Sequence, residues 1–163
     1  MSLKNVRLEV MQFLEKNVDS FVDQFLIPVE KIWQPSDFLP NSENENFIEE
    51  VKTNTPGYVA TAVADVKTGV LYGSDSAVPS FDPAIASVYN LEVAKAKMTA
   101  IKALGLDSKL ENILINLNNQ IHIIDLAEDG SYFVYLAVDS SKANLGMTMA
   151  LLNKYKKNLK DKL

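Results

Sequence analysis

The segment 82–104 has the periodicity of a long helix that is apolar on two opposite sides. Asp82 can cap its first turn, Pro83 suits the first helical position, and Gly105 suits the position just past its end. At about 100° per residue, two stripes emerge: Ile85, Tyr89, Val93, Ala96, Ala100 and Leu104 on one side, and Ala84, Val88, Leu91, Ala94, Met98 and Ile101 on the other. A helix that covers a sheet needs only one such stripe.

The second stripe needs a cover of its own, because an exposed apolar stripe would promote association. The cover is the N-terminal segment, a second copy of the protein, or the rest of the same chain. Burying such a stripe stabilises the protein by several kcal/mol, at about 25 cal/mol per Å² of apolar surface. We expect a dimer interface formed by these residues: Val88, Leu91, Ala94, Met98 and Ile101.

Short apolar runs on both sides of this helix predict five strands. They lie at 58–65, 70–73, 112–117, 120–126 and 132–138. Gly69 can supply the positive φ of the first turn, and Asn118-Asn119 and the segment 128–131 suit the later hairpins. A last helix is expected from about Ala143 to Leu159. This order indicates an α+β fold with a five-stranded antiparallel sheet and flanking helices.

The order of elements from about residue 46 to 163 resembles the Roadblock/dynein light-chain family, whose fold is profilin-like. The run 58–65 followed by Thr68-Gly69-Val70-Leu71-Tyr72 is similar to that family's first strand, acidic residue and turn. The runs 111–115, 121–126 and 133–138 resemble its central meander, and Ala143-Asn144-Leu145-Gly146 resembles the start of its last helix.

This resemblance implies that the domain forms a homodimer or heterodimer. In that family the long middle helices pack together and central strands pair across the interface. Prokaryotic relatives bind or regulate small Ras-like GTPases, and eukaryotic relatives link dynein to cargo or scaffold GTPases. The resemblance therefore implies recognition through surfaces.

Upstream, a helical pattern over about 6–25 precedes Pro28-Val29-Glu30-Lys31-Ile32-Trp33-Gln34-Pro35-Ser36-Asp37-Phe38-Leu39-Pro40. This stretch resembles the beginning of the soluble acyl-carrier-protein desaturases, over about residues 6 to 52. Its prolines predict an extended segment, and its motif residues are Trp33, Pro35, Asp37, Phe38 and Leu39. We divide the chain into a desaturase-like extension, 1–52, and a Roadblock-like domain, 53–163, at the turn signal of residues 53–57.

The residues that desaturase chemistry needs are missing. Its di-iron site is built from inward-facing Glu and Glu-x-x-His pairs in a helix bundle, and the chain contains no Glu-x-x-His. The single histidine, His122, lies in a strand-like run and is expected to face solvent or a partner. Ser140-Ser141 has no neighbouring histidine base and is expected to cap the last helix. We therefore expect no enzymatic activity, no catalytic or metal-binding residues and no cofactor.

The sequence also lacks the residues for nucleotide chemistry. It contains no glycine-rich phosphate loop. The only arginine is Arg7, so the Roadblock-like domain has no arginine finger to offer a GTPase.

Charge and composition restrict the partners and the location. The net charge is −5; residues 1–52 hold ten acidic and five basic residues, and the rest hold eleven of each. Only the lysines near the C-terminus approach a basic stripe, which we interpret as a solvated helix face, so we expect no nucleic-acid binding. There is no cysteine and no apolar run of membrane-spanning length. The first seven residues lack the apolar core of a signal peptide, and we expect a cytoplasmic protein.

Two hypotheses follow. The first is a non-catalytic dimerisation and protein-interaction domain that regulates or scaffolds a small Ras-like GTPase. The alternative is an accessory or degenerate relative of the acyl-carrier-protein desaturases in fatty-acid metabolism, without the di-iron site. The first predicts a homodimer that co-purifies with a GTPase, and the second predicts co-purification with an acyl carrier protein or a desaturase.

Overall fold

The computed structural model describes residues 42–157 and residue 159. In chain order these contain α2 (Ser42–Asn54), β1 (Tyr58–Asp65), β2 (Leu71–Ser76), α3 (Pro83–Ala103), β3 (Asn112–Asn116), β4 (Gln120–Leu126), β5 (Tyr132–Asp139) and α4 (Leu145–Lys156). The helix expected at 6–25 and the motif residues Trp33, Pro35, Asp37, Phe38 and Leu39 lie outside the described residues.

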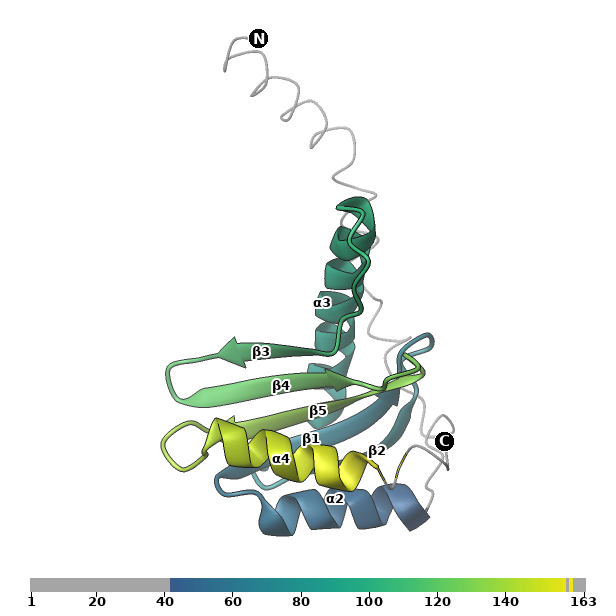
Figure 1. Cartoon of the computed structure of the whole chain (residues 1–163). Helices are drawn as coiled ribbons and strands as arrows, with labels where there is room; N and C mark the ends of the chain where they lie inside the picture. The colour runs from purple at the N-terminus through teal and green to yellow at the C-terminus, as the bar shows by residue number, and fades with distance from the viewer. Residues whose placement is uncertain (1–41, 158, 160–163) are drawn as a thin grey trace. The chain divides into compact units, whose positions relative to one another are not determined.

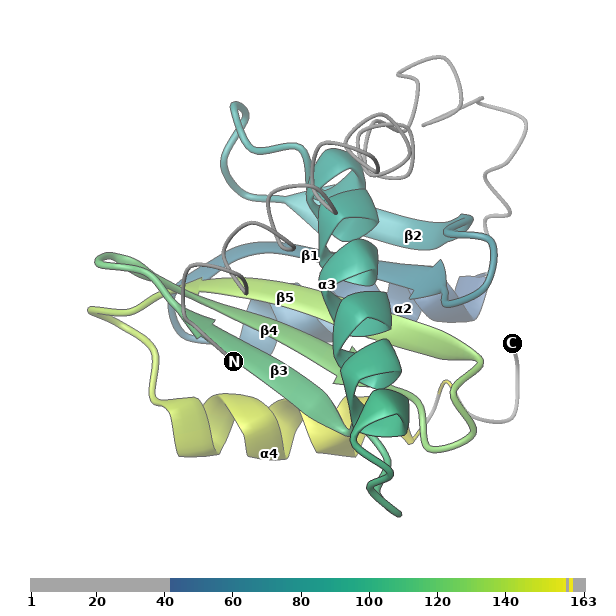
Figure 2. The ribbon, with the colours of Figure 1, turned by 90° about the horizontal axis from the view of Figure 1, so that it is seen from above.

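The five strands form one antiparallel sheet in the order β2-β1-β5-β4-β3. Helix α3 crosses one face of the sheet, and α2 and α4 lie side by side on the other (Figures 1 and 2). The expected fold class is confirmed. Strand β2 extends beyond the prediction because Ser74 and Asp75 continue the pairing with β1.

The face under α2 and α4 holds one of the two clusters of the core. Phe47 and Val51 of α2 meet Leu152 and Tyr155 of α4 above strand residues such as Leu136. Helix α2 therefore belongs to the same core as α4. The domain division at 52/53 falls inside α2 and, as a division of the chain, stays a prediction.

The face under α3 combines small residues of β1 with the aromatic side chains of Phe133 and Tyr135 in β5. Ala60, Ala62 and Ala64 of β1 are completely or almost completely buried there, together with Ala137 of β5. Small side chains let a helix lie close to a sheet, and tight packing of this kind leaves little room for change. The buried residues of α3 are Ser87, Asn90, Leu91 and Ala94.

The ends of α3 are formed as its sequence predicts. The Asp82 carboxylate accepts hydrogen bonds from the backbone N–H groups of Ala84 (2.8 Å) and Ile85 (3.3 Å), and Pro83 is the first helical residue. Gly105 lies past the C-terminal end with a φ of 64°, a left-handed conformation that costs glycine little. Gly69, at φ 75°, likewise makes the turn between β1 and β2.

The cap of the last helix differs from the prediction. The Asn144 side chain accepts from the Met147 backbone N–H at 3.0 Å and is the N-cap of α4. Ser141, which was expected to cap this helix together with Ser140, instead donates its N–H and hydroxyl to the Asp139 carboxylate, at 2.9 and 2.6 Å. The carboxylate at the end of β5 therefore holds the serine in a turn that precedes the helix.

A partly buried ion pair fastens α4 to the sheet. The Lys156 Nζ lies 2.6 Å from the Asp125 Oδ2 and also donates to the Leu126 carbonyl at 3.1 Å. Burial of the Asp125 carboxyl raises its pKa above the ordinary value, although the lysine beside it acts in the opposite direction. Loss of either partner would leave the other poorly compensated.

Candidate interaction surface

Helix α3 presents an apolar stripe on the side that faces away from the sheet. Its large members are substantially exposed: Ile85 49%, Tyr89 62%, Val93 42% and Leu104 69%. Ala96 and Ala100 lie between them at helical spacing, and Ala96 is also exposed. No charged residue of α3 falls within this arc. We call these six residues the outer stripe: Ile85, Tyr89, Val93, Ala96, Ala100 and Leu104.

The opposite stripe, which was expected to form the dimer interface, faces the sheet of its own chain. Leu91 and Ala94 are 4% and 1% exposed in the core beneath α3, and Met98 packs against that core. Val88 and Ile101 are half-buried. The assignment of Leu91 and Ala94 to a dimer interface is therefore corrected, because these side chains have no surface left for a partner.

The outer stripe has charged borders. Glu92 and Lys95 form an ion pair of 3.2 Å along one side of it, and Lys97 is exposed on the other. An apolar centre with a charged rim is the usual anatomy of a protein–protein interface. The residues were visible in the sequence as one of two equal stripes, but the sequence did not show which stripe faces outward.

Strand β3 adds a second open feature that the sequence analysis did not identify. Within the described sheet β3 pairs with β4 alone, so no described strand pairs with the backbone groups of its other edge. Leu114 and Leu117 are 40% and 47% exposed, and the strand contains neither a charged residue nor a proline. Edge strands are normally protected from pairing by such residues. The feature of the sequence that could have indicated this edge is Leu114, an exposed leucine in a strand without charged residues.

His122, which was expected to face solvent or a partner, lies half-buried on the α3 side of the sheet. Its Nε2 is 2.9 Å from the Gln120 Oε1, and its Nδ1 is 3.1 Å from the Tyr135 hydroxyl. Because the Gln120 oxygen can only accept, Nε2 carries the proton and Nδ1 accepts from Tyr135. Phe81 packs edge-on against the imidazole ring. Burial lowers the pKa of His122, so the neutral ring is favoured.

The described part of the chain does not assemble a metal site or a membrane span. Among residues 42–157 and 159, no three His, Cys, Asp or Glu side chains are grouped to hold a metal ion. None of the helices within these residues is both long enough and apolar enough to cross a membrane.

The arrangement of sheet and helices is that of the Roadblock/LC7 domains. A Roadblock/LC7 domain from Streptomyces avermitilis superposes with a TM-score of 0.62 at 8% identity, covering 71% of this chain and 92% of that one. The gliding protein MglB from Thermus thermophilus gives 0.61 at 20% identity, with coverage of 78% and 95%. MglB from Myxococcus xanthus gives 0.58 at 13% identity, with coverage of 73% and 89%. These likenesses establish the Roadblock fold.

The sequence model of the family described as fatty acid desaturase matches residues 6–96, and the chain belongs to that family. The chloroplastic stearoyl-[acyl-carrier-protein] 9-desaturase 5 of Arabidopsis thaliana is 45% identical over 51 residues, which are 31% of this chain and 13% of that protein. The corresponding enzyme of Elaeis guineensis var. tenera is 43% identical over 51 residues, with the same coverage. The chain thus spans only a small part of these relatives, and within the family match β1, β2 and the first part of α3 belong to the Roadblock fold.

Proposed function

We propose that this chain is a non-catalytic dimerisation and protein-interaction domain of the cytoplasm that regulates or scaffolds a small Ras-like GTPase. The outer stripe of α3 carries this proposal. A continuous exposed apolar surface along a whole helix is unusual for a monomer and marks an interaction site. The resemblance to the Roadblock family supports a second copy of the chain as the first partner, because it implies a dimer in which the long middle helices pack together.

The outer stripe is complementary to itself. When two α3 helices pack antiparallel about a two-fold axis between positions 94 and 95, each large residue meets a smaller or equal one. The contacts join Tyr89 to Ala100, Val93 to Ala96, and Ile85 to Leu104 of the other copy. A two-fold interface requires such matching of one surface with itself. Interdigitation of large and small side chains also allows the two helices to approach closely.

The open edge of β3 gives the same two copies a second contact. Two β3 strands that pair edge to edge would satisfy their unpaired backbone groups and join the two sheets. Leu114 and Leu117 would then be covered at the junction.

The GTPase is assigned from the resemblance to Roadblock proteins. The described residues contain no arginine, so the domain acts on its partner by contact and positioning and supplies no arginine finger. The test is co-purification of the full chain with a Ras-like GTPase of its own organism. If the chain forms a dimer but no GTPase co-purifies with it, the GTPase part of the proposal is wrong and the dimerisation part stands.

The assembly is tested by sedimentation equilibrium of the full chain at micromolar concentration, where we expect a dimer. Tyr89→Glu places a charge in the centre of the outer stripe and should weaken association by about 2 kcal/mol or more, roughly thirtyfold. Lys102→Glu is the control, because Lys102 is exposed on α3 outside the stripe. A monomer mass for the unmodified chain would refute the proposal.

The packing register has its own test. Tyr89→Ala and Ala100→Tyr should each weaken the dimer, the first by opening a cavity and the second by overpacking. The double swap should restore association, because it recreates the large–small contact with the partners exchanged. Equal or additive weakening in the double variant would exclude this register.

The alternative function is an accessory relative of acyl-carrier-protein desaturases, favoured by the 45% identity over 51 residues. It predicts that the full chain captures an acyl carrier protein or a desaturase, and that Trp33→Ala with Phe38→Ala abolishes the capture. The outer-stripe variant Tyr89→Glu should leave this capture unchanged. Iron at one or two atoms per purified chain would contradict both functions, since each assumes that the di-iron site is absent.

A further inference from the structure

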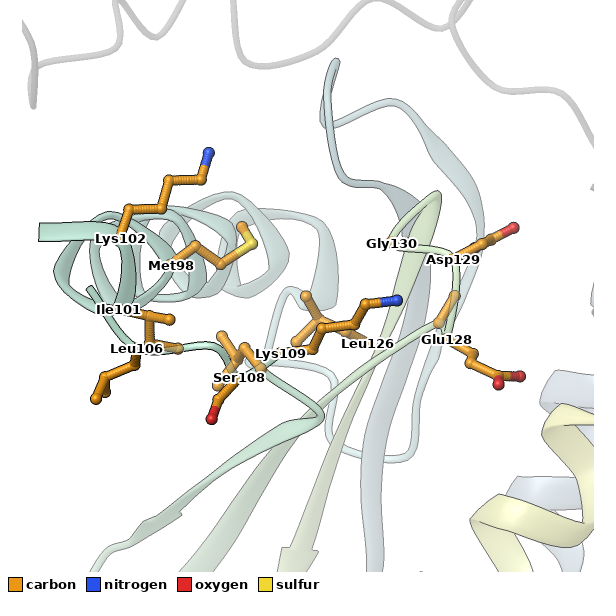
Figure 3. Close-up of a pocket in the computed structure, with 12 residues that line it drawn as sticks. Met98, Ile101, Lys102, Leu106, Ser108, Lys109, Leu126, Glu128, Asp129 and Gly130 are labelled. Carbon is orange, nitrogen blue, oxygen red and sulfur yellow. The ribbon is translucent and has the colours of Figure 1, made fainter. Parts of the chain in front are cut away.

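A pocket of about 270 Å³ lies between the C-terminal end of α3 and the turn that joins β4 to β5 (Figure 3). Its lining is apolar on the α3 side, where Met98, Ile101 and Leu106 contribute, and at its base, where Leu110 and the almost fully buried Leu126 lie. It is separate from the centre of the outer stripe.

The helix cap forms one wall of this pocket. The Leu106 N–H donates to the Ile101 carbonyl at 3.1 Å, and the Gly105 N–H donates to the Lys102 carbonyl at 3.0 Å. This pair of bonds is the Schellman arrangement, which folds the residue after the glycine back against the last helical turn. The left-handed Gly105 therefore brings Leu106 to the side of Ile101.

The hairpin turn forms the opposite wall. The Gly130 N–H donates to the Ala127 carbonyl at 2.9 Å, and the Ala127 N–H donates to the Tyr132 carbonyl at 2.9 Å. The Asp129 carboxylate accepts from the N–H and hydroxyl of Ser131, at 3.0 and 2.7 Å. In Figure 3 the carboxylates of Glu128 and Asp129 are directed away from the space between the walls.

One cation reaches across the pocket. Figure 3 shows the ammonium of Lys109 extending between α3 and the hairpin turn, whereas the ammonium of Lys102 is directed away from the pocket. Neither lysine forms an ion pair with another part of the chain that the structure describes. Of the four charged residues in the lining, Lys102, Lys109, Glu128 and Asp129, only Lys109 directs its charged group into the space above the apolar residues.

We propose that this pocket binds a short straight-chain monocarboxylate, with the aliphatic chain against Leu126 and Leu110 and the carboxylate at the Lys109 ammonium. The volume lies just below the range of about 300–1,000 Å³ that is typical of small-molecule sites, so the ligand is small. A second charge on the ligand would have to enter the apolar base without a partner, which is costly. A neutral aliphatic ligand would leave the Lys109 ammonium without a partner in the pocket. This inference does not depend on the dimer or on the GTPase.

The test uses the full chain, sodium octanoate as the probe, and two-dimensional NMR of the backbone amides. We expect saturable shifts at the amides of Gly130, Leu126 and Leu106. Affinity should rise about fourfold for each methylene from butanoate to octanoate, as burial of aliphatic groups requires. The absence of saturable shifts at these amides would overturn the proposal.

Two matched lysine variants separate this site from general apolar binding. Lys109→Gln should weaken octanoate binding about threefold to fivefold, the size of an exposed ion pair, and leave 1-octanol binding unchanged. Lys102→Gln should leave both affinities unchanged. Both lysines are exposed, and an unaltered spectrum of the free variants confirms the fold. Equal effects of the two variants, or octanoate shifts confined to the outer stripe, would refute the proposal.

Discussion

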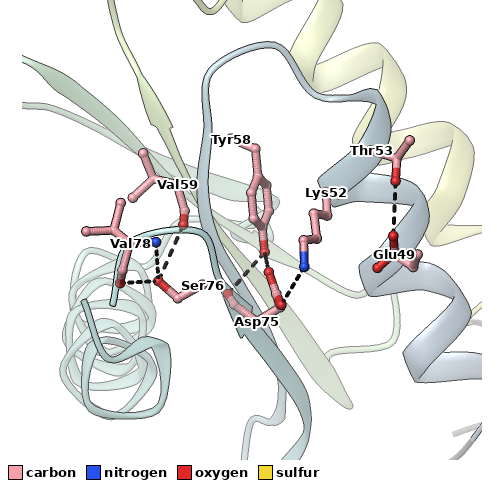
Figure 4. Close-up of polar contacts among 8 residues, drawn as sticks. All are labelled: Glu49, Lys52, Thr53, Tyr58, Val59, Asp75, Ser76 and Val78. Carbon is pink, nitrogen blue, oxygen red and sulfur yellow. Dashed lines mark hydrogen bonds and ion pairs between the residues drawn. The ribbon is translucent and has the colours of Figure 1, made fainter. Parts of the chain in front are cut away.

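The two edge strands of the sheet differ in their charged residues: β2 contains Asp75, which is bonded to other parts of its own chain, whereas β3 contains no charged residue. The Asp75 carboxylate of β2 receives the Lys52 ammonium of α2 at 3.0 Å and the Tyr58 hydroxyl at 3.0 Å (Figure 4). The Ser76 hydroxyl donates to the Val78 carbonyl at 2.8 Å just beyond the strand. Strand β3 has no comparable charged or polar contact among the described residues. The β2 edge thus carries a charged residue that is bonded to its own chain, and the β3 edge carries none, which is why β3 is the edge proposed to pair with a second copy.

The largest expected effect is on dimer association, when β3 receives the charged residues that normally protect edge strands from pairing. Leu114→Lys combined with Leu117→Lys should weaken the dimer by about 2–4 kcal/mol, because two lysines in each copy would have to be buried at the junction. Sedimentation equilibrium measures this change. Ser74→Lys places a lysine on β2 and should leave the dimer mass unchanged. If both edges tolerate lysine equally, the difference between them has no role in assembly.

The second effect concerns β2 and is a change in stability. Asp75→Ala removes the acceptor of both Lys52 and Tyr58, and should lower the free energy of unfolding by about 1–2 kcal/mol. Burial raises the pKa of the Tyr58 hydroxyl, and the bond to Asp75 acts in the same direction, so the hydroxyl remains a donor at neutral pH. Urea unfolding measures the change, with Glu49→Ala as the control in α2. If Asp75→Ala became monomeric without a loss of stability, β2 would be needed for assembly and not for stability, which contradicts the proposed difference between the two edges.

Local signals made the order of helices and strands predictable. The packing between segments far apart in the chain was not predictable. The cap at Asp82 and the glycines at 69 and 105 act within a few residues, and each lies where the sequence placed it. The inward stripe of α3 was not predictable, because both stripes are apolar and the choice depends on the buried alanines of β1, more than twenty residues upstream. The open edge of β3 depends on strand order, which likewise arises only in the folded sheet.

The same limit applies to the contacts of His122. In the sequence it stands alone among isoleucines, and its partner Tyr135 lies on the neighbouring strand. The Roadblock fold could be recognised from the pattern of elements, since several weak motifs agree with one order. The helix cap at Gly105 and the hairpin turn at residues 128–131 were each predicted as local features, but the pocket requires that the two lie side by side, which arises only in the folded chain.

The smallest expected effect is a pH dependence of the free energy of unfolding. It comes from His122 in β4, the strand that pairs with β3. Its ordinary pKa is about 6.5, and burial lowers the pKa in the folded protein. The unfolded chain therefore binds the proton more readily, so His122 stabilises the fold fully above pH 6.5 and less as the pH falls toward the folded pKa. We expect the free energy of unfolding to fall between pH 7.5 and pH 5.5 because of this group. His122→Gln should remove this component, and Asp75→Ala on the β2 side should retain it. An identical pH profile in His122→Gln would show that protonation of this ring does not oppose folding.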